Sequence, residues 1–223
     1  MHHFTPKTLR FLKDLAANNR RDWFEAHRGA YEQDVREPAL RLITAMEARI
    51  REVHPAFMAS SKKVGGSLFR IHRDTRFSGD KTPYKTHIGI TFFHAATRAT
   101  ARTADTGNAA RGRLDAPVFY LHIAPGASFM GGGIWHPQAP ALRQIREYLV
   151  DNPASWRAVT QGPAFARHYT LGGEALVRPP KGFDAQHALI NDLKRKDFIA
   201  SAAVADEDVM RPDLPAWLTR RYQ

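Results

Sequence analysis

The segment FRIHRDTRFSGDKTPYKTHIG, residues 69–89, carries seven Arg, Lys or His side chains and only two acidic ones. An arginine guanidinium can bind a carboxylate or phosphate through two parallel hydrogen bonds, and a lysine ammonium adds a point charge. We therefore predict an anion-binding loop in which Asp74 is the counter-ion that orients one of the arginines. The expected anion-binding residues are Arg70, Arg73, Arg76, Lys81 and Lys85.

Three β-like runs, 67–73, 86–94 and 117–125, alternate between apolar and polar side chains. Successive side chains of a strand point to opposite faces, so each run is expected to have one core face and one polar face. Phe69 and Ile71 are predicted to point to the core. The polar faces together carry Arg70, His72, His87, Tyr120 and His122.

Two histidines and a tyrosine of these segments could transfer protons. Histidine titrates close to neutral pH, and a tyrosine hydroxyl can donate or accept a hydrogen bond. We expect His72, His122 and Tyr84 to be proton donors or acceptors for the bound anion. A solvated sheet face whose histidines are satisfied by hydrogen bonds is the structural alternative.

The segment GASFMGGGIWHP, residues 126–137, contains a second group of candidates. Glycines such as Gly132 and Gly133 permit a close approach of the backbone, and Trp135 could provide a stacking surface. His136 could move a proton. A hairpin turn with a bulge is the alternative interpretation of the glycines.

Metal and cofactor motifs are weak in this chain. His72, Asp74, His122 and His136 are suitable ligand types for zinc or iron, but there is no HExxH motif and the surrounding cations oppose a dication. The glycines match neither a P-loop nor the dinucleotide fingerprint, and no Gly-x-Ser-x-Gly elbow is present. We therefore predict no metal site, and the sequence identifies no cofactor.

The composition favours a globular protein with an anionic partner. The 223 residues include 33 Lys and Arg against 22 Asp and Glu, which gives a net charge of +11, and 43% are hydrophobic. No apolar run approaches the roughly 20 residues that cross a bilayer, so no membrane partner is expected. The absence of cysteine excludes disulfides and thiolate sites, and a cytoplasmic location is predicted. Charge spread evenly over the surface would serve solubility alone, whereas clustered charge indicates binding.

The pattern of elements predicts an α+β fold. A helical layer is expected over 5–51, with its first two helices at 5–18 and 20–36 and a third beginning at Pro38. After the three strands, the sequence predicts helices at 138–150, 184–196 and 213–222 and a last strand at 197–204. This order indicates a mostly antiparallel sheet packed against the N-terminal helical layer and C-terminal helices.

The chain is predicted to form a single domain, 1–223, in which 60–223 holds the sheet and the later helices. Residues 95–115 show no periodicity and contain one large apolar residue, so they predict a mobile loop. The arginines of this loop could alternatively contact an acidic partner.

Four segments together resemble a known family. FRIHRDTRFSGDKTPYKTHIG, YLHIAPGASFMGGGIWHP and LKRKDF look like the signature segments of the domain of unknown function 2461 family, and FLKDLAANNRRDWFEAHRGAYEQDV is similar too. The resemblance covers most of the chain, although the loop at 95–115 is longer than the family's usual connection. It implies an α+β protein from a bacterial and fungal family, and it assigns no catalytic residue.

Three functions are open on the sequence alone. The clustered Arg, Lys and His side chains predict a cationic cleft that binds a phosphorylated or carboxylate small molecule, with or without catalysis. The net charge, Trp135 and the arginines of 95–115 favour a nucleic-acid-binding module as an alternative. The third is a non-catalytic structural or interaction protein whose polar residues lock the loop.

Overall fold

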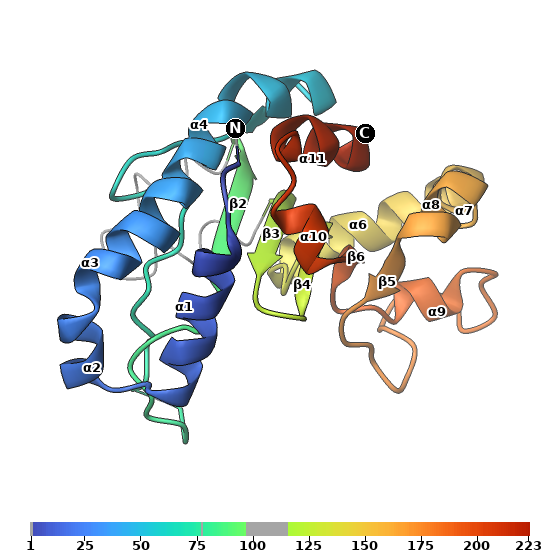
Figure 1. Cartoon of the computed structure of the whole chain (residues 1–223). Helices are drawn as coiled ribbons and strands as arrows, with labels where there is room; N and C mark the ends of the chain where they lie inside the picture. The colour runs from blue at the N-terminus through green and yellow to red at the C-terminus, as the bar shows by residue number, and fades with distance from the viewer. Residues whose placement is uncertain (1, 77, 97–115) are drawn as a thin grey trace. The chain divides into compact units, whose positions relative to one another are not determined.

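The computed structural model describes residues 2–76, 78–96 and 116–223 and contains a six-stranded antiparallel sheet (Figure 1). The strand order is β1-β2-β3-β4-β6-β5. The strands are β1 (Phe57–Met58), β2 (Ile88–His94), β3 (Val118–Ile123), β4 (Ser128–Ile134), β5 (Thr170–Gly172) and β6 (Phe198–Val204). The predicted α+β class is confirmed. Most of the loop predicted at 95–115 lies outside the described residues.

Contacts within the chain divide it into two compact units. The first unit comprises Met1–Phe93, Phe119–Met130 and Ala203–Gln223, and the second comprises His94–Val118 and Gly131–Ala202. The single domain expected over 1–223 stays a prediction.

The helices of the first unit confirm the helical layer predicted at the N-terminus. They are α1 (Pro6–Ala17), α2 (Arg21–Ala26), α3 (Arg28–Tyr31), the π-helical turn η1 (Glu32–Arg36), α4 (Glu37–Val53), α10 (Asp206–Val209) and α11 (Leu214–Tyr222). The single helix predicted over 20–36 is wrong, because the backbone of His27 leaves the helical region at φ −112° and ψ 12° and separates α2 from α3. The closing helix predicted at 213–222 is confirmed by α11.

The core of the first unit depends on α4. Its Leu42, Ile43, Met46 and Ile50 recur at helical spacing and are completely buried. Helix α11 packs against α4 (Figure 1). Each fully buried aliphatic side chain of this kind stabilises the fold by about 1.5–3 kcal/mol relative to an exposed one.

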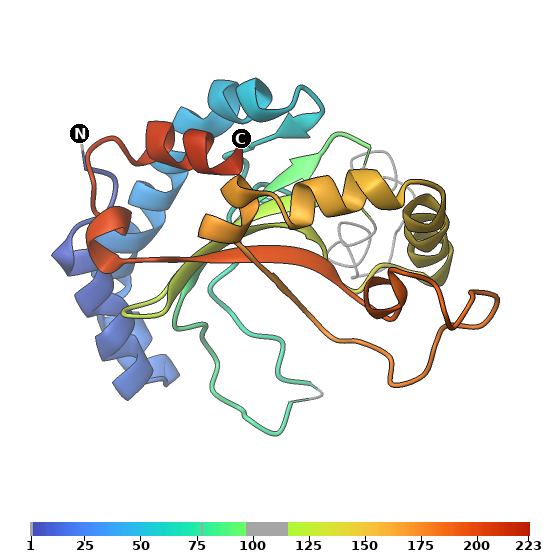
Figure 2. The same ribbon diagram turned by 90° about the vertical axis from the view of Figure 1, so that its right-hand side faces the viewer.

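The strand predicted at 67–73 is irregular in the structure. Isolated β-bridges, and not a continuous ladder, pair it with the chain that follows. They join Leu68 to Ile90 and His72 to Tyr84. Figure 2 shows this region as a long two-limbed loop outside the sheet. The limbs are also joined by backbone hydrogen bonds, from Lys85 N–H to the carbonyl of Ile71 at 2.8 Å and from Arg73 N–H to that of Pro83 at 2.9 Å.

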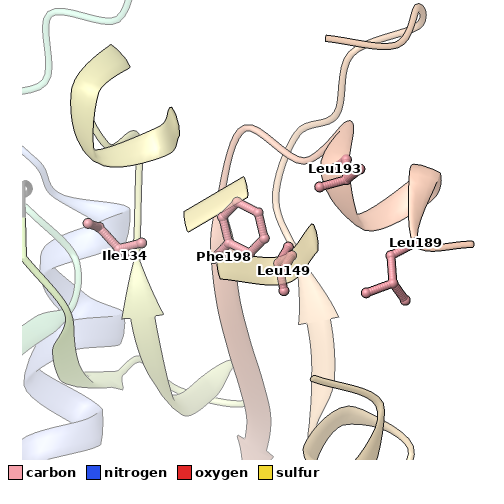
Figure 3. Packing of buried hydrophobic residues seen from close by; sticks show 5 residues of the cluster. All are labelled: Ile134, Leu149, Leu189, Leu193 and Phe198. Atoms are coloured by element: carbon pink, nitrogen blue, oxygen red, sulfur yellow. The ribbon is translucent and has the colours of Figure 1, made fainter. Parts of the chain in front are cut away.

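The second unit contains α6 (Ala139–Asp151), α7 (Pro153–Thr160), α8 (Pro163–His168) and α9 (Ile190–Leu193). Its core cluster consists of Ile134, Leu149, Leu189, Leu193 and Phe198 (Figure 3). The helix and strand predicted at 138–150 and 197–204 are confirmed by α6 and β6.

The long helix predicted over 184–196 is wrong. Only the four residues of α9 are helical in this segment. The Asp184 carboxylate accepts the N–H of Gln186 at 2.9 Å, and Nδ1 of His187 accepts the N–H of Leu189 at 3.1 Å. These local side-chain bonds compete with helical hydrogen bonding and favour turns.

The glycine run lies inside β4, so the hairpin turn weighed for it is wrong. A Cβ atom at Gly131 would lie 2.5 Å from the carbonyl oxygen of Ala200, and one at Gly133 would lie 2.0 Å from that of Phe198. Gly133 also has a φ of 133°. The close approach that these glycines permit is therefore to the backbone of β6.

We predict that Gly133→Ala lowers the free energy of unfolding by about 3 kcal/mol or more, because the added methyl overlaps a strand backbone and the φ is unfavourable. Urea denaturation measures the change. Gly29→Ala is the matched control, since a Cβ atom at Gly29 would meet no heavy atom within 4 Å and alanine favours helix. Equal stabilities of the two variants would contradict the packing described for β4.

Candidate functional site

Tyr84 fixes the base of the loop to the helical layer. Its ring is 2% exposed and stacks on Phe24 with 4.2 Å between the ring centroids. The side-chain amide of Asn19 donates to the Tyr84 carbonyl at 2.9 Å and accepts the Tyr84 N–H at 3.0 Å. Tyr84, expected as a proton donor or acceptor, is therefore placed as a buried anchor of the loop.

Two arginines of the loop have carboxylate partners beside them. Arg76 forms a two-bonded pair with Asp74, at 3.0 and 2.7 Å, and this hydrogen bonding lowers the pKa of Asp74 to about 2. Arg73 pairs with Asp80 and also donates to the hydroxyl of Thr82. The Thr82 N–H and then the Arg73 guanidinium lower the pKa of Asp80 to about 2. These pairs hold the tip of the loop together.

Lys81 and Lys85 donate to backbone carbonyls instead. Lys81 Nζ lies 2.9 Å from the carbonyl oxygen of Thr75. Lys85 Nζ lies 2.6 Å from that of Arg70 and 3.0 Å from that of His72. Burial, followed by the positive charges of Arg70 and Arg73, lowers the pKa of Lys85 to about 8.

Two predicted strands bring a pair of histidines together. His87 stacks on His122 with 4.2 Å between ring centroids, and His122 stacks in turn on Phe129 at 4.6 Å. The hydroxyl oxygen of Tyr120 lies 3.1 Å from Nδ1 of His122. We call Lys85, His87, Tyr120 and His122 the histidine cluster, because the charge of Lys85 also acts on His87.

The histidine cluster holds its imidazoles neutral. Burial, then the neighbouring His122 and Lys85, lowers the pKa of His87 to about 4. Burial also lowers the pKa of His122, and it raises the pKa of Tyr120 to about 12. At neutral pH the cluster therefore presents uncharged rings beside a lysine that is close to its own pKa.

Phe69 lies on the polar face rather than in the core, which corrects its predicted position. Its side chain is 41% exposed, and its ring lies 5.8 Å from that of Tyr120. A Cβ atom at Gly89 would lie 2.9 Å from the Phe69 ring and 3.0 Å from the Tyr120 hydroxyl. The irregular backbone of 67–73 breaks the strict alternation on which the prediction rested.

His72 is exposed on the loop, outside the histidine stack. Its ring lies 5.2 Å from that of Tyr84 and 6.4 Å from that of Phe24. Its backbone carbonyl accepts a hydrogen bond from Lys85. The His72 carbonyl is thus hydrogen-bonded to Lys85 of the histidine cluster, whereas the His72 ring lies near the ring of Tyr84, which anchors the loop.

The second unit contains a separate candidate site at His136. The carboxylate of Asp197, completely buried, accepts the backbone N–H of His136 at 2.7 Å and lies 3.0 Å from its Nδ1. The other carboxylate oxygen accepts the N–H of Glu174 at 2.8 Å. His136 has a φ of 48°, a conformation that costs a residue with a side chain about 1–3 kcal/mol.

Trp135 lies beside this histidine. Its side chain is 50% exposed, and its ring centroid lies 4.3 Å from that of His136. Gly132 and Gly133 belong to the same strand, β4, that leads to Trp135. Trp135 and His136 therefore form a half-exposed aromatic pair above a buried carboxylate.

Within residues 2–76, 78–96 and 116–223, no three His, Asp or Glu side chains converge in a way that could hold a metal ion. None of the helices there is both long and apolar enough to cross a membrane.

The fold and the polar face define an α+β protein with a histidine-rich sheet surface. The chain belongs to the DUF2461 family, whose model, described as a conserved hypothetical protein, matches residues 7–223. The resemblance found in the sequence is thereby confirmed. No curated protein and no solved structure matches the chain.

Sequence reasoning missed Asp197 and Phe129 as site residues. Asp197 directly precedes an apolar strand, where a carboxylate is expected to be solvated, and its partner His136 lies 61 positions away in the sequence. Phe129 has the pattern of an ordinary strand residue, and only the pairing of β3 with β4 places its ring on His122. His87 was recognised by strand alternation.

We predict that acid destabilises the protein partly through His87. The pKa of His87 is depressed in the folded state. His87 is therefore protonated near pH 6.5 in the unfolded chain but only near pH 4 in the folded chain. Stability is thus fully present above pH 6.5 and falls as the pH drops through this window. His87→Phe keeps a stacked ring without titrating, so its free energy of unfolding, measured by urea denaturation, should decline less steeply. Identical slopes would contradict the prediction.

We predict that Asn19→Ala lowers the free energy of unfolding by about 2 kcal/mol, because it leaves the backbone N–H and carbonyl of Tyr84 without their partners. Urea denaturation gives the value. Asn18→Ala is the control, since Asn18 makes one side-chain bond, to the Asp14 carbonyl. A loss no larger than that of the control would mean that Asn19 does not anchor the loop.

Proposed function

We propose that the protein binds a small phosphorylated or carboxylate anion at the histidine cluster, with Arg70 and Lys85 as the binding cations. The supporting observation is that neither cation forms an ion pair with any residue that the structure describes, whereas Arg73 and Arg76 are paired with Asp80 and Asp74. Asp74 also feels the charge of Arg70, but its direct ion pair is with Arg76. Neighbouring cations that lack a direct ion-pair partner favour an anionic ligand.

The geometry of Lys85 suits direct contact with an anion. An ammonium group has three N–H donors, and two of them are used on the carbonyls of Arg70 and His72. The third is available to a ligand oxygen. A bound anion would offset the repulsion from Arg70 and Arg73 and raise the pKa of Lys85 again.

The neutral imidazoles would serve as hydrogen-bond donors or acceptors for such a ligand. The ring nitrogens of His87 make no hydrogen bond within the described part of the chain, and His122 uses only its Nδ1, with Tyr120. When the Tyr120 hydroxyl donates, Nε2 of His122 carries the ring proton and can donate to a ligand oxygen. In this proposal His122 and His87 carry any proton transfer.

The remaining cations would shape the loop. Arg73, Arg76 and Lys81 are engaged with Asp80, Asp74 and the Thr75 carbonyl within the same turn. We therefore divide the anion-binding set expected from the sequence into two contact residues, Arg70 and Lys85, and three that hold the turn in place. His72 and Tyr84 would position the loop.

A thermal-shift titration with inorganic phosphate and with succinate, against sodium chloride at equal ionic strength, tests the proposal. A ligand at about 100 times its Kd should raise the melting temperature by on the order of 5 °C. Arg70→Gln and Lys85→Gln should remove the shift. Arg20→Gln, which changes the same charge at an exposed site paired with Asp22, should keep it. A shift that survives both site variants would overturn the proposal.

We predict that anion binding weakens as the pH rises through about 8, because Lys85 loses its proton there. The Kd is measured by isothermal titration calorimetry across this range. Lys85→Arg keeps its charge, so its binding should persist above pH 8. If the wild-type Kd stays constant through pH 9, Lys85 does not contribute its charge.

The net charge of +11 favours nucleic acid as a second candidate ligand. Such binding would weaken steeply with salt, by about one unit of log–log slope per phosphate contact. A gel shift with single-stranded and double-stranded oligonucleotides at two salt concentrations decides between the candidates. Absence of a shift at low salt would remove nucleic acid and leave the small anion.

A further inference from the structure

We propose that His136, held by Asp197, is a second reactive centre, a general base that activates water against an ester bearing a planar aromatic group. This centre lies wholly in the second unit and is independent of the anion site proposed for the histidine cluster. It rests on the geometry of His136, Asp197 and Trp135.

The buried carboxylate of Asp197 sets the orientation of the His136 ring. Asp197 is completely buried, and its Oδ1 lies 3.0 Å from Nδ1 of His136. A carboxylate in this position accepts the Nδ1 proton and leaves the lone pair on Nε2. The His136 side chain is 46% exposed, so this nitrogen belongs to a ring that solvent can reach.

The fold does not require a histidine at position 136. Asp197 already secures the backbone by accepting the N–H groups of His136 and Glu174 at 2.7 and 2.8 Å. The φ of 48° at His136 is adopted more readily by glycine or asparagine. Proton transfer needs an aligned imidazole, and the buried carboxylate aligns this one. Packing alone would not favour a histidine in this disfavoured backbone conformation.

His27 resembles His136 in lying beside a tryptophan ring, but its Nδ1 faces a backbone carbonyl instead of a carboxylate. Its ring stacks on Trp23 with 4.1 Å between centroids, and its Nδ1 lies 2.8 Å from the carbonyl of Trp23. Such an exposed histidine beside a tryptophan, here at the end of α2, is an ordinary surface pair. Only His136 combines the tryptophan, the buried carboxylate and the positive φ among the residues that the structure describes.

Trp135 indicates which substrate this centre would accept. Trp135 offers a half-exposed indole that can stack a planar aromatic group. Phosphoryl transfer needs cations on the phosphate oxygens, and Arg195 and Lys196, which directly precede Asp197, are already paired with carboxylates. An uncharged ester fits this environment better.

The chemical step is an ordinary hydrolysis. Nε2 of His136 takes a proton from water while the water oxygen bonds to the ester carbonyl carbon. The tetrahedral intermediate then breaks its bond to the leaving oxygen, which takes the proton from the imidazolium. The products are a carboxylic acid and an alcohol, so ester plus water balances.

Hydrolysis of p-nitrophenyl acetate by the full chain, followed by absorbance, is the test. His136→Asn should reduce the rate by about 100-fold, toward that of the remaining side chains, and His27→Asn should leave it unchanged. Trp135→Ala should raise KM more than it lowers kcat. His136→Gly, which suits the positive φ, replaces the asparagine variant if that variant is misfolded by circular dichroism.

The ring orientation has its own readout. Nitrogen-15 NMR of the wild-type protein should show the His136 tautomer with its proton on Nδ1, as the pairing with Asp197 requires. An Nε2–H tautomer, or a hydrolysis rate in the His136 variants within twofold of wild type, would overturn the proposal. Neither result depends on the anion site, so the two proposals fail separately.

Discussion

The reciprocal hydrogen bonds between Asn19 and the backbone of Tyr84 are the constraint on which the site in the first unit depends. The loop has no regular secondary structure, so the strands cannot fix its conformation. Stacking of Tyr84 on Phe24 buries its base, and the backbone pairing of its two limbs extends that order to Lys85. Lys85 in turn holds the carbonyls of Arg70 and His72, which brings a half-buried ammonium beside His87.

Charge compensation separates the cations of this loop by role. A guanidinium beside a carboxylate is neutralised locally and holds a turn, as Arg76 does with Asp74. A cation that has only carbonyl partners keeps its field, and burial strengthens that field because water no longer screens it. Lys85 is in this second situation. Burial and then the neighbouring charges of Arg70 and Arg73 depress its pKa. Burial and then His122 and Lys85 depress that of His87.

The second unit uses a buried charge differently. Asp197 has no cationic partner among the described ion pairs except His136, yet it accepts two backbone N–H groups and so keeps its hydrogen bonds. A Cβ atom at Gly173 would lie 2.3 Å from that of Asp197, so a glycine there makes room for the carboxylate. One side chain thus fastens two backbone segments and orients a ring.

The sequence by itself determined the α+β class, the helical layer, strands β2, β3 and β6, and the shared face of His87, Tyr120 and His122, because hydrophobic periodicity and strand alternation are local properties. The helix predicted over 184–196 is wrong because local side-chain hydrogen bonds to the backbone favour turns there. The predicted core position of Phe69 is wrong because the irregular backbone exposes its side chain. The pairing of Asp74 with a neighbouring arginine was also within reach of the sequence, because the two residues are two positions apart. Tertiary structure alone decided which carboxylate meets His136, since Asp197 lies 61 positions away. The energy of such a pairing depends on burial, which no local pattern encodes.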